Sequence, residues 1–312
     1  MHGILVIDKP PGITSHDVVA SVRHILHERR IGHAGTLDPF ATGVLVVLVG
    51  SATRLAQFFT ASDKEYEAII RIGFATDTGD RTGKPIRPPE LPLKTDWTDD
   101  DIKKALLTLT GDIEQVPPMY SAKKRQGQKL YELARRGETV HRDPIKVCIH
   151  EFHAVKTDGE MIKDNLDGTY DLAVRVACSS GTYVRTLAED FGKRLRVGAH
   201  LAELRRTRVG PFNLSHAISL PDLKTRFAEE ALGTHLVSPS TALSHMPLLH
   251  LSTDDERKAR NGMEVSAERT DWTDGTQVRM CTTNDELIAI GEFNAKENRV
   301  HPYVVLAGSS AR

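Results

Sequence analysis

Cysteine is scarce in this chain and follows no pairing pattern. Its three cysteines, Cys148, Cys178 and Cys281, lie far apart in the sequence, and no C-x-x-C pair occurs. A disulfide scaffold requires an even, regularly spaced set of cysteines, and a zinc site requires clustered ligands. The sequence therefore favours neither class, and we expect no bound metal.

Long apolar runs are also missing. The unbroken run from Val44 to Val49 is bounded by glycines and is too short to span a membrane. The first twelve residues contain no basic leader, and their apolar stretch is too short for a signal peptide. We therefore expect a cytoplasmic protein without a membrane partner.

Two frequent catalytic motifs are absent from the sequence. It contains neither a P-loop nor a G-x-S-x-G nucleophile elbow, and no second catalytic acid stands at a recognisable spacing. These absences disfavour a nucleotide-phosphate enzyme and a carboxylate-dependent hydrolase.

Charge is balanced overall but unevenly distributed. The formal net charge of the 312 residues is −1, yet residues 121–146 hold eight Lys/Arg against three Asp/Glu, and residues 193–208 hold six against one. Acidic residues exceed basic ones in residues 89–114 and from residue 248 to the end. Separated basic blocks on a neutral protein suit a face that meets a polyanion, although each block alone could equally be a solvated helix face.

The stretch from Gly32 to Gly50 combines a glycine-punctuated loop with the valine-rich run. Six apolar residues rich in valine predict a strand buried on both faces. The loop carries Asp38 directly before Pro39, and a following proline disfavours the helical conformation. Asp-Pro alone most often begins a turn, but a rigid loop beside a buried strand can also hold a reactive side chain in place.

Periodicity predicts a mixture of helices and strands along the rest of the chain. Apolar spacing and capping boxes predict helices over residues 14–27, 52–59, 98–109, 128–136 and 182–195. Alternating or apolar runs predict strands over residues 3–7, 44–49, 64–73, 145–155, 170–178, 277–281, 287–293 and 301–306. Residues 83–96 form a proline-rich connection, and residues 211–247 contain helices and turns that end in a linker.

Arg185 occupies an unfavourable place in the helix predicted from about Thr182. A cation in the first turn opposes the helix dipole at a cost of roughly 0.3 to 1 kcal/mol, which is small enough to occur by chance. A carboxylate partner elsewhere in the chain would also explain why an arginine stands at this position.

Several motifs together resemble one enzyme family. The segment G-H-x-G-T-L-D-P-x-A-T-G-V-L resembles the signature of the TruB-type tRNA pseudouridine synthases, which modify the uridine at position 55 in the T loop of tRNA. Further segments similar to the family are K-P-x-G, Q-x-P-P-x-Y-S-A-x-K, G-T-Y-x-R-x-L, G-A-H and L-R-R-T. The resemblance covers residues 1–210.

The resemblance implies roles for individual residues. It makes Asp38 the catalytic aspartate, Arg185 its partner, and Tyr66 the residue that stacks on the target base and is a candidate to move the C5 proton. A cation within about 4 to 6 Å lowers a carboxylate pKa, so we expect Arg185 to keep Asp38 ionised. The substrate-binding residues implied by the motifs or by the first basic block are Lys9, Pro10, His33, Asp80, Tyr183, Leu204, Lys123 and Lys124. For Tyr66 a core position, and for His33 a bond to its own loop, remain open.

The family fold is α+β, with a mixed, mainly antiparallel central sheet and flanking helices. The C-terminal strands resemble a small PUA module, so we expect a catalytic domain over residues 1–245 and a PUA-like RNA-binding domain over residues 246–312. The expected partner is the T-arm of tRNA, bound by a monomer that flips the target base and needs no cofactor or protein partner. A non-catalytic RNA-binding or tRNA-folding module is the alternative, although it would not require Asp38, Tyr66 and Arg185 together.

Overall fold

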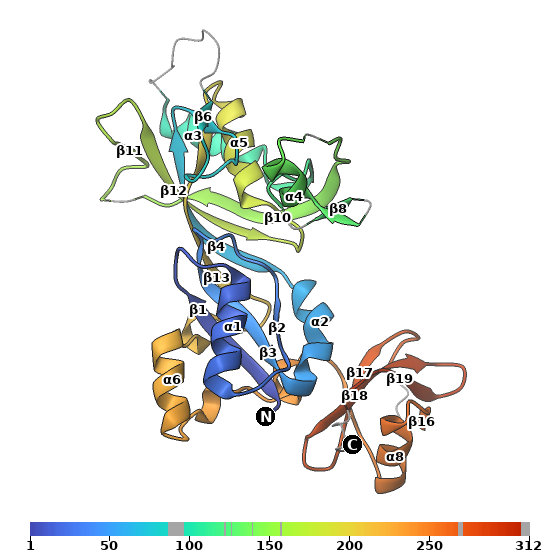
Figure 1. The fold of residues 1–312 in the computed structure, drawn as a ribbon. Helices are drawn as coiled ribbons and strands as arrows, with labels where there is room; N and C mark the ends of the chain where they lie inside the picture. Colours follow the sequence, from blue (N-terminus) through green and yellow to red (C-terminus); the bar gives the residue numbers. More distant parts are fainter. Residues whose placement is uncertain are drawn as a thin grey trace.

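A large sheet with flanking helices and a smaller C-terminal sheet make up the structure (Figure 1). This computed structural model describes residues 1–86, 97–121, 123–125, 127–138, 140–156, 158–267 and 271–306. Most of the proline-rich connection expected over residues 83–96 lies outside these residues. None of the helices in the described ranges has the length and apolar character that crossing a membrane requires.

Within the residues that the structure describes, the large sheet contains ten strands, and its only parallel pairing between strands is the short one of β13 with β3. Seven strands follow one another across it in the order β1 (Gly3–Lys9), β3 (Thr42–Val49), β13 (Ala199–Val209), β4 (Lys64–Ile72), β12 (Tyr170–Cys178), β10 (Ile145–Ala154) and β7 (Gly111–Gln115). Three more strands pair at the side of this path: β2 (Ile31–Ala34) with β3, β11 (Ile162–Asp164) with β12, and β14 (Phe212–Asn213) with β13.

Strand β3 anchors one half of this sheet. Its residues from Val44 to Val49 have no exposed surface, which confirms the prediction of a strand buried on both faces. Successive side chains point to opposite faces of a strand, so one set joins the apolar cluster around Phe59 and the other joins the cluster around α1 (Ser15–Leu26). The loop that precedes β3 is thereby attached to a rigid element.

Helices begin where the capping signals predicted. Thr14 caps α1 and Thr98 caps α3 (Asp99–Leu107), each through a complete capping box. Helix α5 (Val184–Arg194) packs its Leu187 and Phe191 against the inward face of β4. The remaining helices of the larger part are α2 (Ala56–Thr60), α4 (Leu130–Arg135), α6 (Leu220–Ala228), α7 (Pro239–Ala242) and 3-10 helices at Gly50–Leu55, Leu214–His216 and Gly233–His235.

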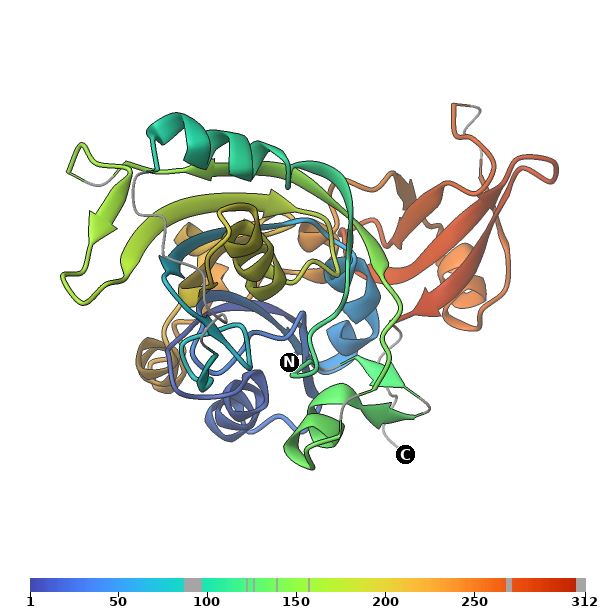
Figure 2. The same cartoon turned by 90° about the horizontal axis from the view of Figure 1, so that it is seen from above.

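The C-terminal sheet has five strands and one helix and fits a PUA-like module. Its strand order is β15 (Leu248–His250), β17 (Gln277–Cys281), β18 (Leu287–Asn294), β19 (Arg299–Val305) and β16 (Val265–Ser266), with α8 (Thr253–Arg260) packed on it. From above, this sheet lies to one side of the large one (Figure 2). Ile290 and Val304 share an apolar cluster with β3, so the two parts have continuous packing.

Three local predictions need correction. The longest strand of the large sheet, β13, was not predicted, because its arginine-rich sequence lacks strand alternation. The helix expected over residues 128–136 begins only at Leu130, after the two-residue strand β9 (Gln128–Lys129) that pairs with β8 (Lys124–Arg125). The helix expected over residues 52–59 divides into a 3-10 turn and α2. A further short pair joins β5 (Ala75–Thr76) to β6 (Pro85–Ile86).

Candidate active site

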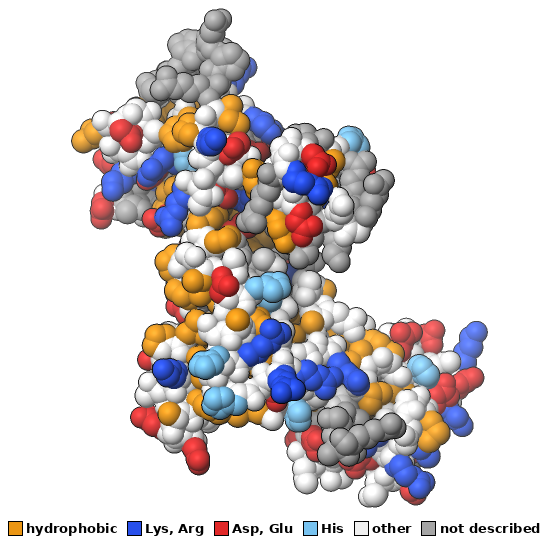
Figure 3. All heavy atoms as spheres, in the orientation of Figure 1, with side chains coloured by type: hydrophobic (Ala, Val, Ile, Leu, Met, Phe, Trp, Pro, Cys, Tyr) orange, Lys and Arg blue, Asp and Glu red, His pale blue; other side chains and the backbone are white. Residues whose placement is uncertain are grey.

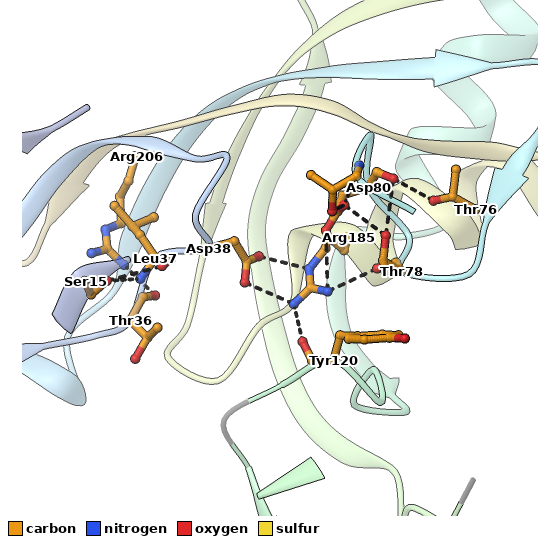
Figure 4. A network of polar contacts seen from close by, with 11 residues as sticks. Ser15, Thr36, Leu37, Asp38, Thr76, Thr78, Asp80, Tyr120, Arg185 and Arg206 are labelled. Carbon is orange, nitrogen blue, oxygen red and sulfur yellow. Dashed lines mark hydrogen bonds and ion pairs between the residues drawn. The ribbon is translucent and has the colours of Figure 1, made fainter. Parts of the chain in front are cut away.

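Asp38 lies in the short connection between β2 and β3. These strands pair antiparallel, with His33 opposite Val47, so the predicted loop is the tip of a hairpin. The Ala41 N–H donates to the Asp38 carbonyl at 3.1 Å and closes a turn there. Asp-Pro therefore forms a turn, and the same turn holds the Asp38 carboxylate so that it points toward α5 (Figure 4).

Arg185 pairs with Asp38, as the resemblance implied. Its Nε lies 2.9 Å from Asp38 Oδ2, and its Nη2 donates to Asp38 Oδ1 at 3.2 Å. The arginine side chain is only 5% exposed, whereas that of Asp38 is 32% exposed. The ion pair thus joins a buried guanidinium to a carboxylate that solvent or a substrate can still reach.

The rest of the guanidinium is held by backbone carbonyls and a second aspartate. Nη2 also donates to the Tyr120 carbonyl at 2.7 Å, and Nη1 donates to the Thr78 carbonyl at 3.1 Å. Asp80 Oδ2 lies 3.7 Å from Nη1. A guanidinium carries five N–H donors in a rigid fork, and the four groups around this one use all three of its nitrogens. Figure 4 shows this coordination.

Burial raises the pKa of Asp38 above its ordinary value, and the positive charges of Arg185 and Lys9 oppose the rise. The neighbouring charge of Asp80 adds to it. Arg185 lowers the pKa of Asp38, as expected of a nearby cation, but the net shift is upward because loss of hydration outweighs this attraction; that Asp38 stays ionised remains a prediction. The arginine limits the increase rather than reversing it.

Asp80 is a buried member of this network. Its side chain accepts hydrogen bonds from the hydroxyls of Thr78 at 2.9 Å and Thr82 at 2.6 Å and from the Thr82 N–H at 2.9 Å. These donors fix the carboxylate so that its other oxygen faces Arg185. Asp80 therefore supports the arginine that pairs with Asp38.

Lys9 is fully buried beneath the same hairpin tip. Its Nζ donates to the carbonyls of Pro10 at 2.9 Å, Pro39 at 3.1 Å and Ala41 at 2.7 Å. Burial lowers the pKa of Lys9 to about 8, and the charge of Asp38 opposes this effect. The lysine joins the end of β1 to both sides of the Asp38 turn, so the structure places Lys9 and Pro10 beside the loop.

Tyr66 and Leu204 line the inward face of the sheet next to the hairpin. Register pairs Tyr66 of β4 with Arg206 of β13, and Ala68 with Leu204, so these side chains share one face. Tyr66 is 8% exposed, and burial raises the pKa of its phenol. Tyr66 is therefore a core residue at the edge of the site. A core position is compatible with the proposed stacking of Tyr66 on the target base.

Arg206 was not singled out by the sequence. This side chain is 1% exposed, and it donates to the carbonyls of Val44 at 2.8 Å and Gly35 at 2.9 Å. It lies opposite Tyr66 in the sheet, and its charge opposes the rise in the pKa of the phenol. Arg206 therefore links strand β3 to the start of the Asp38 turn and lies next to Tyr66. The parallel pairing of β13 with β3 brings the arginine to this place, and no local sequence pattern indicates that pairing.

His33 lies in strand β2, and the two lysines lie at the β8–β9 hairpin. Nδ1 of His33 is buried without a hydrogen-bond partner, and burial beside His16 and Arg206 lowers the pKa of His33 to about 4. The suggested bond to its own loop is not formed by this nitrogen. Lys123 is exposed, and Lys124 pairs through its backbone in the β8–β9 hairpin.

Basic side chains gather on one face of the molecule near the C-terminal end of α1. Exposed arginines and histidines follow the C-terminal end of α1 and the connection to β2: Arg23, His24, His27, Arg29 and Arg30. The space-filling view shows Lys, Arg and His side chains over this region (Figure 3).

A hollow of about 530 Å³ opens on the outward face of the sheet, lined by Glu67, Arg175 and Arg205 among others. Asp38, Tyr66 and Arg185 are not among the described residues that line it, but Leu204 and Phe40 are, so it borders the candidate site. No three His, Cys, Asp or Glu side chains within the described ranges are arranged to hold a metal ion.

Comparisons with known proteins agree on one family. Residues 23–184 match the N-terminal domain model of TruB family pseudouridylate synthases, and residues 185–244 match the tRNA pseudouridylate synthase B C-terminal domain. The chain is similar to tRNA pseudouridine synthase B of Aromatoleum aromaticum, with 46% identity over 80% of this chain and 76% of the relative. It is 38% identical to tRNA pseudouridine synthase B of Solibacter usitatus over 98% of this chain and 100% of the relative.

Its fold is similar to the crystal structure of a Cbf5-Nop10-Gar1 complex, with a TM-score of 0.71 and 27% identity over 98% of this chain and 85% of that chain. The fold, the Asp38–Arg185 pair on its hairpin tip and the two family matches therefore lead to one conclusion: the chain belongs to the TruB family of pseudouridylate synthases.

Proposed function

We propose that this protein isomerises the T-loop uridine of tRNA, at position 55, to pseudouridine, with Asp38 as its catalytic residue. The family membership supports the reaction and the tRNA substrate. The observation that carries the assignment of Asp38 is its ion pair with the buried Arg185, because that pair holds a partly exposed carboxylate in one orientation.

The reaction requires few catalytic groups. The N1 glycosidic bond breaks, the uracil rotates, and a new bond forms from C5 to the ribose, with no redox change and no hydrolysis. A carboxylate is a competent covalent catalyst or anionic stabiliser, and Asp38 is exposed enough to meet the target nucleotide in either role. Whether Asp38 attacks the ribose or the base is left open by this proposal.

Tyr66 is the proposed stacking partner of the uracil and a candidate to move the C5 proton. Burial raises the pKa of Tyr66, so its phenol is protonated at neutral pH. A protonated phenol accepts another proton only if it passes its own onward, so the raised pKa favours a relay over a simple base. Arg206 lies opposite Tyr66 in the sheet, and its charge opposes the rise in the phenol pKa.

The target uridine must leave the RNA stack, which costs on the order of a few kcal/mol. Phosphate contacts from the basic face around α1 and from Lys123 and Lys124 would offset that cost. His33 is the proposed residue that fills the space left by the base. Its lowered pKa means that it would do so as a neutral ring rather than as a cation.

The remaining expectations form part of the same proposal. Residues 1–245 would be the catalytic domain and residues 246–312 a PUA-like domain that adds RNA contacts. The protein would act as a cytoplasmic monomer. Sedimentation of the purified protein alone and with tRNA would test the oligomeric state.

Incubating the purified protein with unmodified tRNA, followed by mapping of pseudouridine at single-nucleotide resolution, tests the function. We expect one modified position, in the T loop. Tight tRNA binding with no pseudouridine would instead favour the non-catalytic RNA-binding or tRNA-folding module.

A further inference from the structure

Helix α5 begins without a side-chain cap of its own. Tyr183 occupies the N-cap position but makes no side-chain capping bond, and the first turn contains no acidic residue. Four N–H groups at a helix start need outside partners, and an N-cap without a side-chain bond leaves the helix start less stable. Arg185 stands in this weakly supported turn, where the helix dipole also disfavours it. Another part of the chain must therefore hold the turn that carries the arginine.

Gln115 supplies this support from the end of β7. Its side chain is 1% exposed. Its Oε1 accepts a hydrogen bond from the Tyr183 N–H at 3.0 Å, and its Nε2 donates to the Tyr183 carbonyl at 3.3 Å. One amide thus binds both backbone groups of the N-cap residue, as a neighbouring strand would.

The chain segment that follows Gln115 reaches the arginine itself. The Tyr120 carbonyl, five residues after Gln115, accepts a hydrogen bond from Arg185 Nη2 at 2.7 Å. Pro117 and Pro118 lie between these contacts and restrict the backbone. The segment from Gln115 to Ser121 therefore contacts both the start of α5 and the guanidinium.

We propose that Gln115 is a positioning residue for the uridine isomerisation and acts through Arg185. Its amide fixes the backbone two residues before the arginine, and Tyr120 fixes the guanidinium, so the fork stays in register with the Asp38 carboxylate. This inference rests on the proposed function for its kinetic consequence, but the geometric part stands on the contacts alone. A misplacement of about 1 Å in such a constellation costs on the order of 10²-fold in rate.

Two substitutions of Gln115 distinguish a role in positioning Arg185 from a role in filling space in the core. Gln115→Met keeps the length and apolar stem but loses both bonds to Tyr183, whereas Gln115→Glu can still accept from the Tyr183 N–H but, when ionised, cannot donate to its carbonyl. We expect the single-turnover rate of pseudouridine formation to fall about 10- to 100-fold in Gln115→Met and less in Gln115→Glu. The dissociation constant for tRNA should stay within about twofold, because Gln115 is buried.

A matched control lies in the C-terminal part of the chain. Ser240 is 5% exposed, and its hydroxyl accepts a hydrogen bond from Arg279 Nη1 at 3.2 Å, so Ser240→Ala also removes a buried polar contact but none at α5. We expect an unchanged rate in this variant. An equal loss of rate in Ser240→Ala and Gln115→Met would show general destabilisation and overturn the proposal.

A double-mutant cycle tests whether Gln115 acts through Arg185. If it does, Gln115→Met should cost less than about threefold in an Arg185→Lys background, because the fork is already lost. A full 10- to 100-fold cost in that background would overturn the proposal.

Hydrogen exchange of the Arg185 Nε–H, followed by ¹⁵N NMR, is independent of turnover. We expect exchange at least about tenfold faster in Gln115→Met than in the unsubstituted protein, because opening of the ion pair exposes this proton to water. Unchanged protection would contradict the positioning role. A protein that forms no pseudouridine but shows the exchange difference would refute the proposed function and leave the role of Gln115 intact.

Discussion

Replacing Arg185 separates the two effects that its guanidinium has on Asp38, a positive charge and a fixed geometry. Arg185→Gln removes the charge, and Arg185→Lys keeps it while losing the fork that binds Asp38 through two nitrogens. Because Arg185 is one of the groups that hold the pKa of Asp38 down, its loss leaves burial and Asp80 less opposed. The pKa of Asp38 should then rise.

A higher pKa of Asp38 should shift the pH profile of the rate in a definite direction. If Asp38 acts as a carboxylate, the rate falls on the acid side as it becomes protonated, so a higher pKa moves the acid limb of the pH profile toward higher pH. A close opposite charge is worth about one to three pKa units, so Arg185→Gln should move the limb by about that much. Arg185→Lys should leave the limb in place. Both variants should also lose about 10²-fold at the plateau, because the fork is gone.

Single-turnover release of tritium from tRNA labelled at uridine C5, measured from pH 5 to 9, provides the profile. Enzyme in excess over tRNA removes product release from the measurement. Acid limbs that coincide in Arg185→Gln and Arg185→Lys would refute the reasoning, because the charge would then have no separate effect on Asp38. A plateau unchanged in Arg185→Lys would refute the geometric part.

Two further predictions concern stability. Burial lowers the pKa of His33 from 6.5 to about 4, so between these pH values the unfolded chain binds the proton more readily than the folded one. The free energy of unfolding should therefore fall by up to about 3 kcal/mol as the pH drops through this range. Urea titrations of His33→Gln should lack that fall. Gly43 has φ +97° and an added Cβ would lie 2.2 Å from the Arg206 carbonyl oxygen, so Gly43→Ala should destabilise the fold by at least about 2 kcal/mol. Gly32→Ala, whose Cβ would meet only Thr53 at 3.8 Å, is the control, and equal urea midpoints for the two glycine variants would contradict the prediction.

Local sequence signals accounted for the elements with strong periodicity or caps. The valine-rich run of β3 and the capping box at Thr14 each depend on neighbouring residues, so they can be recognised without tertiary information. Arg185 was conspicuous for a similar reason, because a cation at a helix start is unfavourable without a partner. The family motif then identified Asp38 as that partner.

Features that depend on distant contacts were missed. Strand β13 contains three arginines that suggested a solvated block, yet Arg206 is buried because carbonyls of another strand and a turn accept its donors. Gln115 appeared only as part of a motif near a basic block, and its contact with Tyr183 joins residues 68 positions apart. The net upward shift of the Asp38 pKa could not be read from the motif either, because desolvation depends on everything packed around a side chain.

The central claim is that the carboxylate of Asp38 performs the isomerisation, and Asp38→Asn tests it most directly. Asparagine keeps the shape and an oxygen acceptor for Arg185 but removes the negative charge. With tRNA saturating the variant, and its affinity within several-fold of the unsubstituted protein, mapping of the T loop should detect no pseudouridine at position 55. Undiminished conversion of that uridine by Asp38→Asn would contradict the account.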